Sequence, residues 1–214
     1  RAQQIRASLG GRKILFGVDR LDYTKGIGHR IKAFGELIAS GELSVSDVVL
    51  VQVASPSRER VGPYRELRDE VELMVGRLGG DYSTLEHSPV SYYHQTFGQD
   101  EMAAMYLAAD VMLVTALRDG MNLVAKEFVA TRSDLDGVLV LSEFAGASDE
   151  LRRAVLVNPH DIDGLKTAIL RSLSMDPAER ASRMRSMRKR VFGHDVAAWS
   201  ASFLHELDAT KGRS

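Results

Sequence analysis

Two polar clusters in the chain contain residues that could bind a phosphorylated ligand. The first cluster, residues 18–26, contains Arg20 and Lys25, and the second cluster is residues 118–127. Each follows an apolar run rich in β-branched residues and precedes a helical pattern. In an open α/β sheet, ligands bind at the carboxyl ends of the strands, so both clusters are expected to face one crevice. Together they would offer cations, backbone amides and a carboxylate, which suits a sugar nucleotide.

Arg20 and Lys25 are the candidate phosphate ligands of the first cluster. They lie five residues apart across a predicted strand-to-helix turn, so both side chains could reach one point above the strand end. Lys25 and Gly26 are expected at a helix start, where free amides and the helix dipole favour an anion. A diphosphate fits because Arg binds phosphate as a fork and Lys as a point charge. The alternative is that Arg20 pairs with Asp19 or Asp22 and that Lys25 is solvated.

The second cluster is expected to turn the chain into a helix. Gly120 is free to take a positive φ angle, and Asn122 could cap the helix, leaving the next two amides facing the crevice. Glu127 comes one turn later and could accept both hydroxyls of a ribose. The alternative is an exposed Glu127 that pairs with Lys126 or Arg132.

A third candidate ligand is Arg58, which follows the second predicted strand and is therefore expected at the same edge of the sheet. It could bind another phosphate, and the alternative is a solvated loop arginine. The chain has no cysteine, and none of its histidine pairs has metal-ligand spacing, so no metal site is predicted. The glycine-rich dinucleotide motif, the P-loop and the nucleophile elbow are also missing from the sequence.

Composition limits the partners and the location of the protein. The chain has 214 residues, 44% of them hydrophobic and 27% charged, with a formal net charge of -1. No apolar run approaches the ~18 residues of a membrane span, so no membrane partner is predicted. The basic run at residues 180–190 has no interleaved aromatic residues, which favours a solvated helix face over a nucleic-acid site. Lack of cysteine and of a signal-peptide pattern predicts a cytoplasmic location.

Strand-like and helix-like segments alternate along the chain. Apolar, β-branched-rich runs predict strands at residues 13–18, 48–53, 90–93, 110–115, 137–141 and 155–157. Helical spacing predicts helices at residues 26–40, 63–78, 100–109, 122–131, 161–173, 177–191 and 196–207, with a helical turn at 148–152. This alternation predicts an α/β fold with a doubly wound parallel sheet, Rossmann-like, over residues 11–214. Residues 1–10 are predicted to be the end of a linker helix.

The same clusters carry a resemblance to a known family. The sequences RLDYTKG at 20–26 and RDGMNLVAKE at 118–127 resemble those of trehalose-6-phosphate synthases, as do residues 57–58, 141–146 and 157–161. The resemblance extends through nearly the whole chain. It implies the C-terminal, donor-binding domain of a GT-B glycosyltransferase. It also implies a hexosyltransferase activity, in which glucose passes from UDP-glucose to glucose 6-phosphate with retention of anomeric configuration, without a metal or cofactor.

The resemblance also assigns roles to individual residues. Arg20 and Lys25 match the diphosphate contacts of the family, and Asp119 matches the aspartate that contacts the glucose hydroxyls; these three are the expected catalytic residues. Arg58 matches the arginine that reaches the phosphate of the acceptor. The remaining expected nucleotide-sugar-binding residues, with Glu127 on the ribose, are Phe97, Gly120, Met121, Asn122, Leu123, Val124, Ala125, Lys126 and Glu127.

The sequence departs from the family in what it lacks. Family members carry an N-terminal Rossmann domain with most acceptor contacts, and no residues here correspond to it, so the chain is expected to be a fragment with little activity. Ala116 replaces a usual proline of the family.

Two alternative functions stay open. One is a pseudo-glycosyltransferase of the validoxylamine 7'-phosphate synthase type, and the other is a non-catalytic regulatory subunit of a synthase complex. The sequence does not specify whether the base of the donor nucleotide is uracil, guanine or adenine. An apolar stripe at residues 196–207 could pack on the missing domain or form a homo-oligomer.

Overall fold

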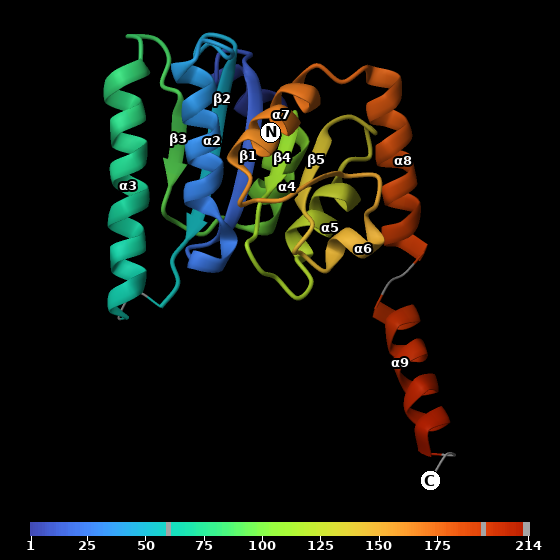
Figure 1. The fold of residues 1–214 in the computed structure, drawn as a ribbon. Coiled ribbons are helices and arrows are strands. Elements are labelled where there is room, and N and C mark those ends of the chain that lie inside the picture. The colour runs from blue at the N-terminus through green and yellow to red at the C-terminus, as the bar shows by residue number, and fades with distance from the viewer. Residues whose placement is uncertain (59–60, 194–195, 212–214) are drawn as a thin grey trace.

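The computed structural model describes residues 1–58, 61–193 and 196–211 of the chain. Six parallel strands form a sheet in the order β3-β2-β1-β4-β5-β6, with helices on both of its faces (Figure 1). The strands are β1 (Lys13–Arg20), β2 (Val48–Ser55), β3 (Val90–Tyr93), β4 (Val111–Val114), β5 (Val138–Ser142) and β6 (Val155–Val157). This order is that of a doubly wound, Rossmann-like sheet, so the predicted fold class is confirmed.

Helices connect the strands and continue after the last one. A 3-10 turn, η1 (Tyr23–Lys25), separates β1 from the helix that follows it. The α-helices are α1 (Ala2–Ser8), α2 (Ile27–Ala39), α3 (Gly62–Tyr82), α4 (Gln99–Ala108), α5 (Leu123–Thr131), α6 (Ala147–Glu150), α7 (Ile162–Leu173), α8 (Pro177–Gly193) and α9 (Val196–Lys211). Each predicted helix therefore corresponds to an observed one, with shifted ends.

Two hydrophobic cores form, one on each face of the sheet. The core on one face packs α2, α3 and α7 against the strands, and its members include Ile31, Phe34, Val71, Leu165 and Ile169. The core on the other face packs α4, α5 and α8 against the strands, and its members include Tyr106, Phe128, Val129, Met184 and Met187. Because both faces are covered, the central strands are apolar on both sides, which explains their continuous hydrophobic runs.

The sheet contains a topological switch point at its centre. β1 continues to β2 on one side, and β4, which pairs with β1 on the other side, continues outward to β5. The connections after β1 and β4 therefore diverge, and the carboxyl ends of two such strands are where open α/β sheets bind their ligands. Both predicted polar clusters follow these two strands.

β1 extends two residues beyond its predicted end. It pairs with β2 up to the partners Arg20 and Ser55, so Asp19 lies inside the strand. Asp19 is only 6% exposed, and its Oδ2 lies 2.5 Å from Nη2 of Arg30 on α2. This ion pair compensates the carboxylate, so a charged residue can occupy a buried strand position.

The basic face of α8 is more than a solvated surface. Arg188 donates to the carbonyl oxygen of Ala130 at 2.5 Å, near the end of α5. Arg180 lies 2.7 Å from a carboxylate oxygen of Asp136. The solvated-face interpretation is therefore wrong for these two arginines and holds for the exposed Arg185. Cations at the last carbonyls of a helix are favourable, which explains how α8 docks on α5.

The two ends of the chain differ in their packing. α1 packs beside α4, and Arg1 and Glu101 form an ion pair of 2.6 Å. α9 extends away from the rest of the fold (Figure 1), and its Trp199 and Phe203 rings stack at 5.5 Å while both are more than half exposed. The linker role of residues 1–10 and the self-association of the chain stay predictions. Within the described ranges, no helix has the length and apolarity needed to cross a membrane.

Candidate functional site

The loops that follow β1 and β4 meet at the switch point. The amide of Leu117 donates to the carbonyl oxygen of Thr24 at 2.7 Å. Gly26 is the N-cap of α2 with a φ of 64°, and a Cβ on it would overlap the carbonyl oxygen of Thr115. Only glycine therefore lets the two loops approach this closely. The structure thus brings the two predicted clusters together.

Lys25 and Asp119 form the centre of this site. The Nζ of Lys25 lies 2.7 Å from Oδ2 of Asp119, and the side chains are only 13% and 17% exposed. Nδ2 of Asn122 donates to the same carboxylate oxygen at 3.0 Å. Burial alone would raise the pKa of Asp119, but the hydrogen bonds from Lys25 and Asn122 outweigh it and lower the pKa. The carboxylate is therefore ionised at neutral pH.

Asn122 caps α5, as predicted. Its Oδ1 accepts a hydrogen bond from the amide of Ala125 at 2.9 Å. The prediction of a positive φ at Gly120 is wrong, because the turn places it at Asn122, with φ 80°. Asparagine tolerates this conformation because its short side chain can hydrogen-bond locally. The amides of Leu123 and Val124, in the first turn of α5, have no acceptor within the helix and remain available to an anion.

Residues 144–147 hold the turn that carries Asp119. The Asp119 amide donates to the Phe144 carbonyl at 3.2 Å, and the Gly146 amide donates to the Asp119 carbonyl at 3.0 Å. A Cβ on Gly146 would overlap the carbonyl oxygen of Gly120. Segment 141–146, which carried part of the family resemblance, therefore acts structurally by supporting the Asp119 turn.

A buried arginine that the sequence analysis missed lies beneath Lys25. Arg30 is fully buried, and besides pairing with Asp19 it donates from Nη2 to the carbonyl oxygen of Lys25 at 2.8 Å. Its Nη1 donates to the carbonyl oxygen of Leu113 in β4 at 2.8 Å. A Cβ on Gly17 would lie 2.5 Å from Nη1, so the guanidinium fits because β1 has glycine there. An arginine on the apolar stripe of a helix and a glycine inside a strand were the available signals.

The first cluster differs from its prediction in one detail. The Lys25 amide donates to the carbonyl oxygen of Asp22 at 3.0 Å, which closes the 3-10 turn. The amide of Lys25 is therefore not free for a ligand, although Gly26 does begin the helix as predicted. The ammonium group of Lys25 remains the part of this residue that can contact a ligand.

Arg58 joins the site through a tyrosine. Its Nη1 donates to the hydroxyl oxygen of Tyr64 at 3.0 Å, and this hydroxyl donates to Oδ2 of Asp22 at 3.2 Å. Asp22 in turn accepts the amide of Thr24 at 2.9 Å. The loop after β2 is therefore hydrogen-bonded to the loop after β1, and Arg58 is exposed without being a free solvated side chain. Tyr64, buried near the start of α3, was not predicted to take part.

Arg20 lies exposed at the end of β1. Asp19 pairs with Arg30, and Asp22 accepts from Tyr64, so neither forms the ion pair with Arg20 that was the alternative. The Arg20 side chain has no hydrogen-bond or ion-pair partner in the described part of the chain. The guanidinium can therefore turn toward a ligand at the strand end.

Glu127 follows on α5 and has a single side-chain partner among the described residues. Its Oε2 accepts a hydrogen bond from the hydroxyl of Tyr106 at 3.0 Å. Lys126 instead lies 2.7 Å from Glu150, and Arg132 lies 3.0 Å from Asp134. The alternative pairings of Glu127 are therefore wrong. The carboxylate is exposed and keeps free acceptor positions.

Other predicted site residues lie at different depths. Met121 and Leu123 are exposed, whereas Ala125 is fully buried and its amide is bonded to Asn122. Phe97 is half-buried beside Tyr93, with ring centroids 5.7 Å apart, and it follows β3. Phe97 also packs against the core on the α4, α5 and α8 face of the sheet. Its role stays a prediction.

Two histidines lie beside the site. The rings of His29, in the first turn of α2, and His160 meet edge to face at 5.7 Å, and His160 also lies 6.0 Å from the ring of Phe144. Burial lowers the pKa of His29, and the charges of His160 and Lys32 lower it further. His29 is therefore neutral at pH 7 and above.

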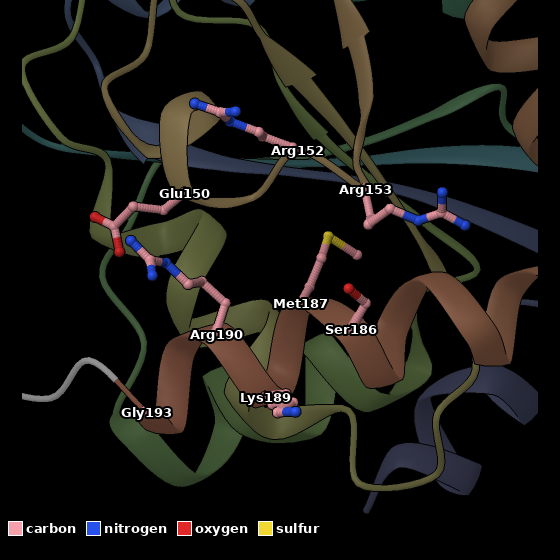
Figure 2. A pocket seen from close by; sticks show the side chains of 8 residues that line it. All are labelled: Glu150, Arg152, Arg153, Ser186, Met187, Lys189, Arg190 and Gly193. Carbon is pink, nitrogen blue, oxygen red and sulfur yellow. The ribbon is translucent and has the colours of Figure 1, made fainter.

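A cavity of about 440 Å³ lies between α8 and the segment around α6 (Figure 2). In Figure 2 the Arg190 side chain extends toward Glu150, whereas the Arg153 side chain points away from Glu150. The cations do not converge on one point, and none of the cavity residues belongs to the switch-point site. No group of three or more potential metal ligands occurs in the described ranges. The prediction that the protein needs no metal is untested.

Comparison with known sequences identifies relatives over nearly the whole chain. The model of glycosyltransferase family 20 matches residues 1–209. The trehalose-6-phosphate synthase of Mycobacterium avium is 56% identical over 208 residues, which are 97% of this chain and 42% of the relative. That of Mycobacterium leprae is 56% identical over 214 residues, which are all of this chain and 43% of the relative. The chain therefore spans less than half the length of these relatives.

Solved structures agree with this result. An alpha,alpha-trehalose-phosphate synthase (UDP-forming) from Burkholderia xenovorans, in complex with glucose-6-phosphate, superposes with a TM-score of 0.92 at 40% identity. The match covers 96% of this chain and 46% of that one. An E. coli structure bound with UDP-2-fluoro glucose gives a TM-score of 0.91 at 39% identity, with the same two coverages.

Proposed function

The chain belongs to glycosyltransferase family 20, and we propose that it is the donor-binding half of an enzyme that makes trehalose 6-phosphate. In this proposal the enzyme transfers glucose from UDP-glucose to glucose 6-phosphate. The convergence of Lys25, Asp119 and the start of α5 at the switch point is the observation that carries it. A cation, a carboxylate and free helix amides lie together where an open α/β sheet binds its ligand.

The proposed roles follow from the chemistry of each group. Arg20 and Lys25 hold the diphosphate, and Asp119 accepts hydrogen bonds from glucose hydroxyls. Glu127 accepts from the ribose hydroxyls, and Arg58 contacts the phosphate of the acceptor. Loss of UDP builds negative charge on the diphosphate, and two fixed cations stabilise that charge in the transition state.

The transfer needs no further reagent in this proposal. The bond between the anomeric carbon and the diphosphate oxygen breaks, and a bond to the acceptor hydroxyl oxygen forms on the same face. The proton of that hydroxyl passes to the leaving diphosphate oxygen, so atoms and charge balance. In this proposal most acceptor contacts come from a further domain, which is consistent with relatives more than twice as long as this chain. The proposed reaction uses no metal or cofactor and takes place in the cytoplasm.

Calorimetric titration of UDP, GDP and ADP into the purified 214-residue chain tests the donor site. We expect UDP to bind more tightly than GDP and ADP. The double variant Arg20→Ala plus Lys25→Ala should lose this binding, because each cation contributes a charge-assisted hydrogen bond to the diphosphate. The matched control Arg185→Ala plus Lys189→Ala removes two exposed charges from α8, away from the site, and should bind like the wild type. Equal UDP affinity in both double variants would contradict the diphosphate assignment.

A further inference from the structure

The hydroxyl of Tyr106 is aimed at the one carboxylate assigned to the ribose. Tyr106 lies on α4 and Glu127 on α5, and the hydroxyl donates to Oε2 of Glu127 at 3.0 Å. Tyr106 is only 4% exposed, whereas Glu127 is exposed. A buried donor therefore holds an otherwise mobile surface carboxylate.

Aromatic packing fixes the position of this donor. The Tyr106 ring meets Phe16 of β1 edge to face at 5.8 Å and meets Phe128 of α5 at 6.3 Å. The hydroxyl can move only if these core contacts change, so its position is set by the sheet rather than by solvent. Burial, together with the charge of Glu127, also raises the pKa of Tyr106. The hydroxyl therefore keeps its proton and remains a donor.

The hydrogen bond restricts the carboxylate without occupying it. A carboxylate offers about four acceptor positions, and Tyr106 uses one of them. No other side chain in the described ranges forms a hydrogen bond or an ion pair with the Glu127 carboxylate. A free glutamate on a helix surface samples several rotamers, and ordering it on binding lowers affinity. A carboxylate already held by Tyr106 avoids most of that loss.

We propose that Tyr106 is a positioning residue, which holds the Glu127 carboxylate so that the site discriminates ribonucleotides from 2'-deoxyribonucleotides. This inference rests on the proposed function, because it needs Glu127 to contact the ribose. A purely structural tyrosine would affect the stability of the α4–α5 contact. It would not change the ratio between two ligands that differ by one hydroxyl.

The test is a pair of calorimetric titrations, with UDP and with 2'-deoxy-UDP, on the 214-residue chain and its variants. The wild type should bind UDP about 10- to 100-fold more tightly, because the 2'-hydroxyl donates to a charged acceptor. In Tyr106→Phe this ratio should fall at least about fivefold, because 2'-deoxy-UDP keeps only the 3'-hydroxyl contact with Glu127 and should therefore lose less affinity than UDP. Adding Tyr106→Phe to Glu127→Gln should lower the ratio no further than Glu127→Gln alone.

Two additional variants separate positioning from folding. Tyr92→Phe removes another largely buried hydroxyl, which has no hydrogen-bond partner among the described residues and lies against the opposite core, and should keep the wild-type ratio. Glu127→Asp keeps the charge but shortens the reach to Tyr106, and should lower the ratio like Tyr106→Phe. Thermal unfolding of Tyr106→Phe sets a titration temperature at which this variant is folded, because only this variant removes the hydrogen bond and leaves Glu127 itself intact.

The outcomes distinguish this inference from the proposed function. A ratio that Glu127→Gln abolishes but that Tyr106→Phe and Glu127→Asp preserve overturns the role of Tyr106 and leaves the donor site intact. A wild-type ratio near one, or one that Glu127→Gln preserves, means that Glu127 does not read the ribose, and the inference fails with that assignment. If the wild type binds neither nucleotide, both the proposed function and the inference fail.

Discussion

The ammonium nitrogen of Lys25 and a carboxylate oxygen of Asp119 lie 2.7 Å apart, joining the loops after β1 and β4 across the switch point of the sheet. Both side chains are largely buried, so solvent and salt screen this ion pair less than a surface pair. The two groups are assigned to adjacent parts of the proposed donor, Lys25 to the diphosphate and Asp119 to the glucose. Their contact therefore holds both in place relative to each other.

Substitution of Lys25 and substitution of Asp119 should have different effects on ligand binding. Lys25→Met should weaken UDP binding about 10- to 100-fold, because the diphosphate loses a charge-assisted hydrogen bond. Asp119→Asn should keep UDP affinity within about threefold, since it frees the ammonium, but should remove any preference for UDP-glucose over UDP. Calorimetry with both ligands measures the two effects. A loss of UDP affinity in Asp119→Asn equal to that in Lys25→Met would mean that the pair acts only through the local fold.

The buried pair of Arg30 and Asp19 should matter mainly for stability. Arg30→Met leaves the Asp19 carboxylate buried without its cation, and such a change typically lowers the free energy of unfolding by about 3–5 kcal/mol. Urea unfolding followed by circular dichroism measures it. Adding Asp19→Asn to Arg30→Met should recover part of the loss, because the uncompensated charge is then gone. A double variant that is less stable than Arg30→Met would show that the charge imbalance is not the cause.

The sequence was sufficient to predict the strands and the edge at which the ligand groups gather. Buried parallel strands need continuous apolar runs, and β1 and β2 have them, so their existence follows from local composition. The caps of α2 and α5 were predictable for the same reason, because Gly26 and Asn122 act on the backbone beside them.

The partners of the polar side chains could not be predicted in this way. Asp19 was weighed as a partner of Arg20, but Arg30, eleven residues away on α2, is the one that reaches it. Tyr106 and Glu127 are 21 residues apart, and only the packing of α4 beside α5 joins them. Such contacts depend on where helices dock on the sheet, which periodicity does not specify. The positive φ at Asn122 instead of Gly120 likewise depends on the contacts with segment 144–147.

Gly26→Ala should impair both folding and UDP binding. Its φ of 64° and the overlap with the Thr115 carbonyl leave no room for a Cβ, so the two loops must separate and Lys25 must move. A control is Gly76→Ala in the exposed interior of α3, where a Cβ meets nothing within 4 Å. That change should raise the free energy of unfolding by about 0.5–1 kcal/mol through helix propensity. Thermal unfolding measures the stability of both variants, and titration measures their affinity for UDP. Unchanged UDP affinity in Gly26→Ala would contradict the role of the close approach between the two loops.

The free energy of unfolding should fall as the pH drops below 6.5, in part because of His29. Its pKa is lowered from 6.5, first by burial and then by His160 and Lys32, while Glu70 opposes the shift. In the window just below pH 6.5 the unfolded chain binds a proton at His29 that the folded chain does not. The contribution of neutral His29 to stability is therefore present above pH 6.5 and is lost as the pH falls through the folded-state pKa of His29.

Substitution of the two histidines tests this pH dependence. The proton resonances of His29 should titrate below pH 6.5 in the wild type. Its midpoint should move upward in His160→Gln, because one opposing positive charge is removed. Urea unfolding at pH 7.5 and at pH 5.5 should show a smaller difference in stability for His29→Gln than for the wild type. An equal difference would mean that other groups, and not His29, account for the acid sensitivity.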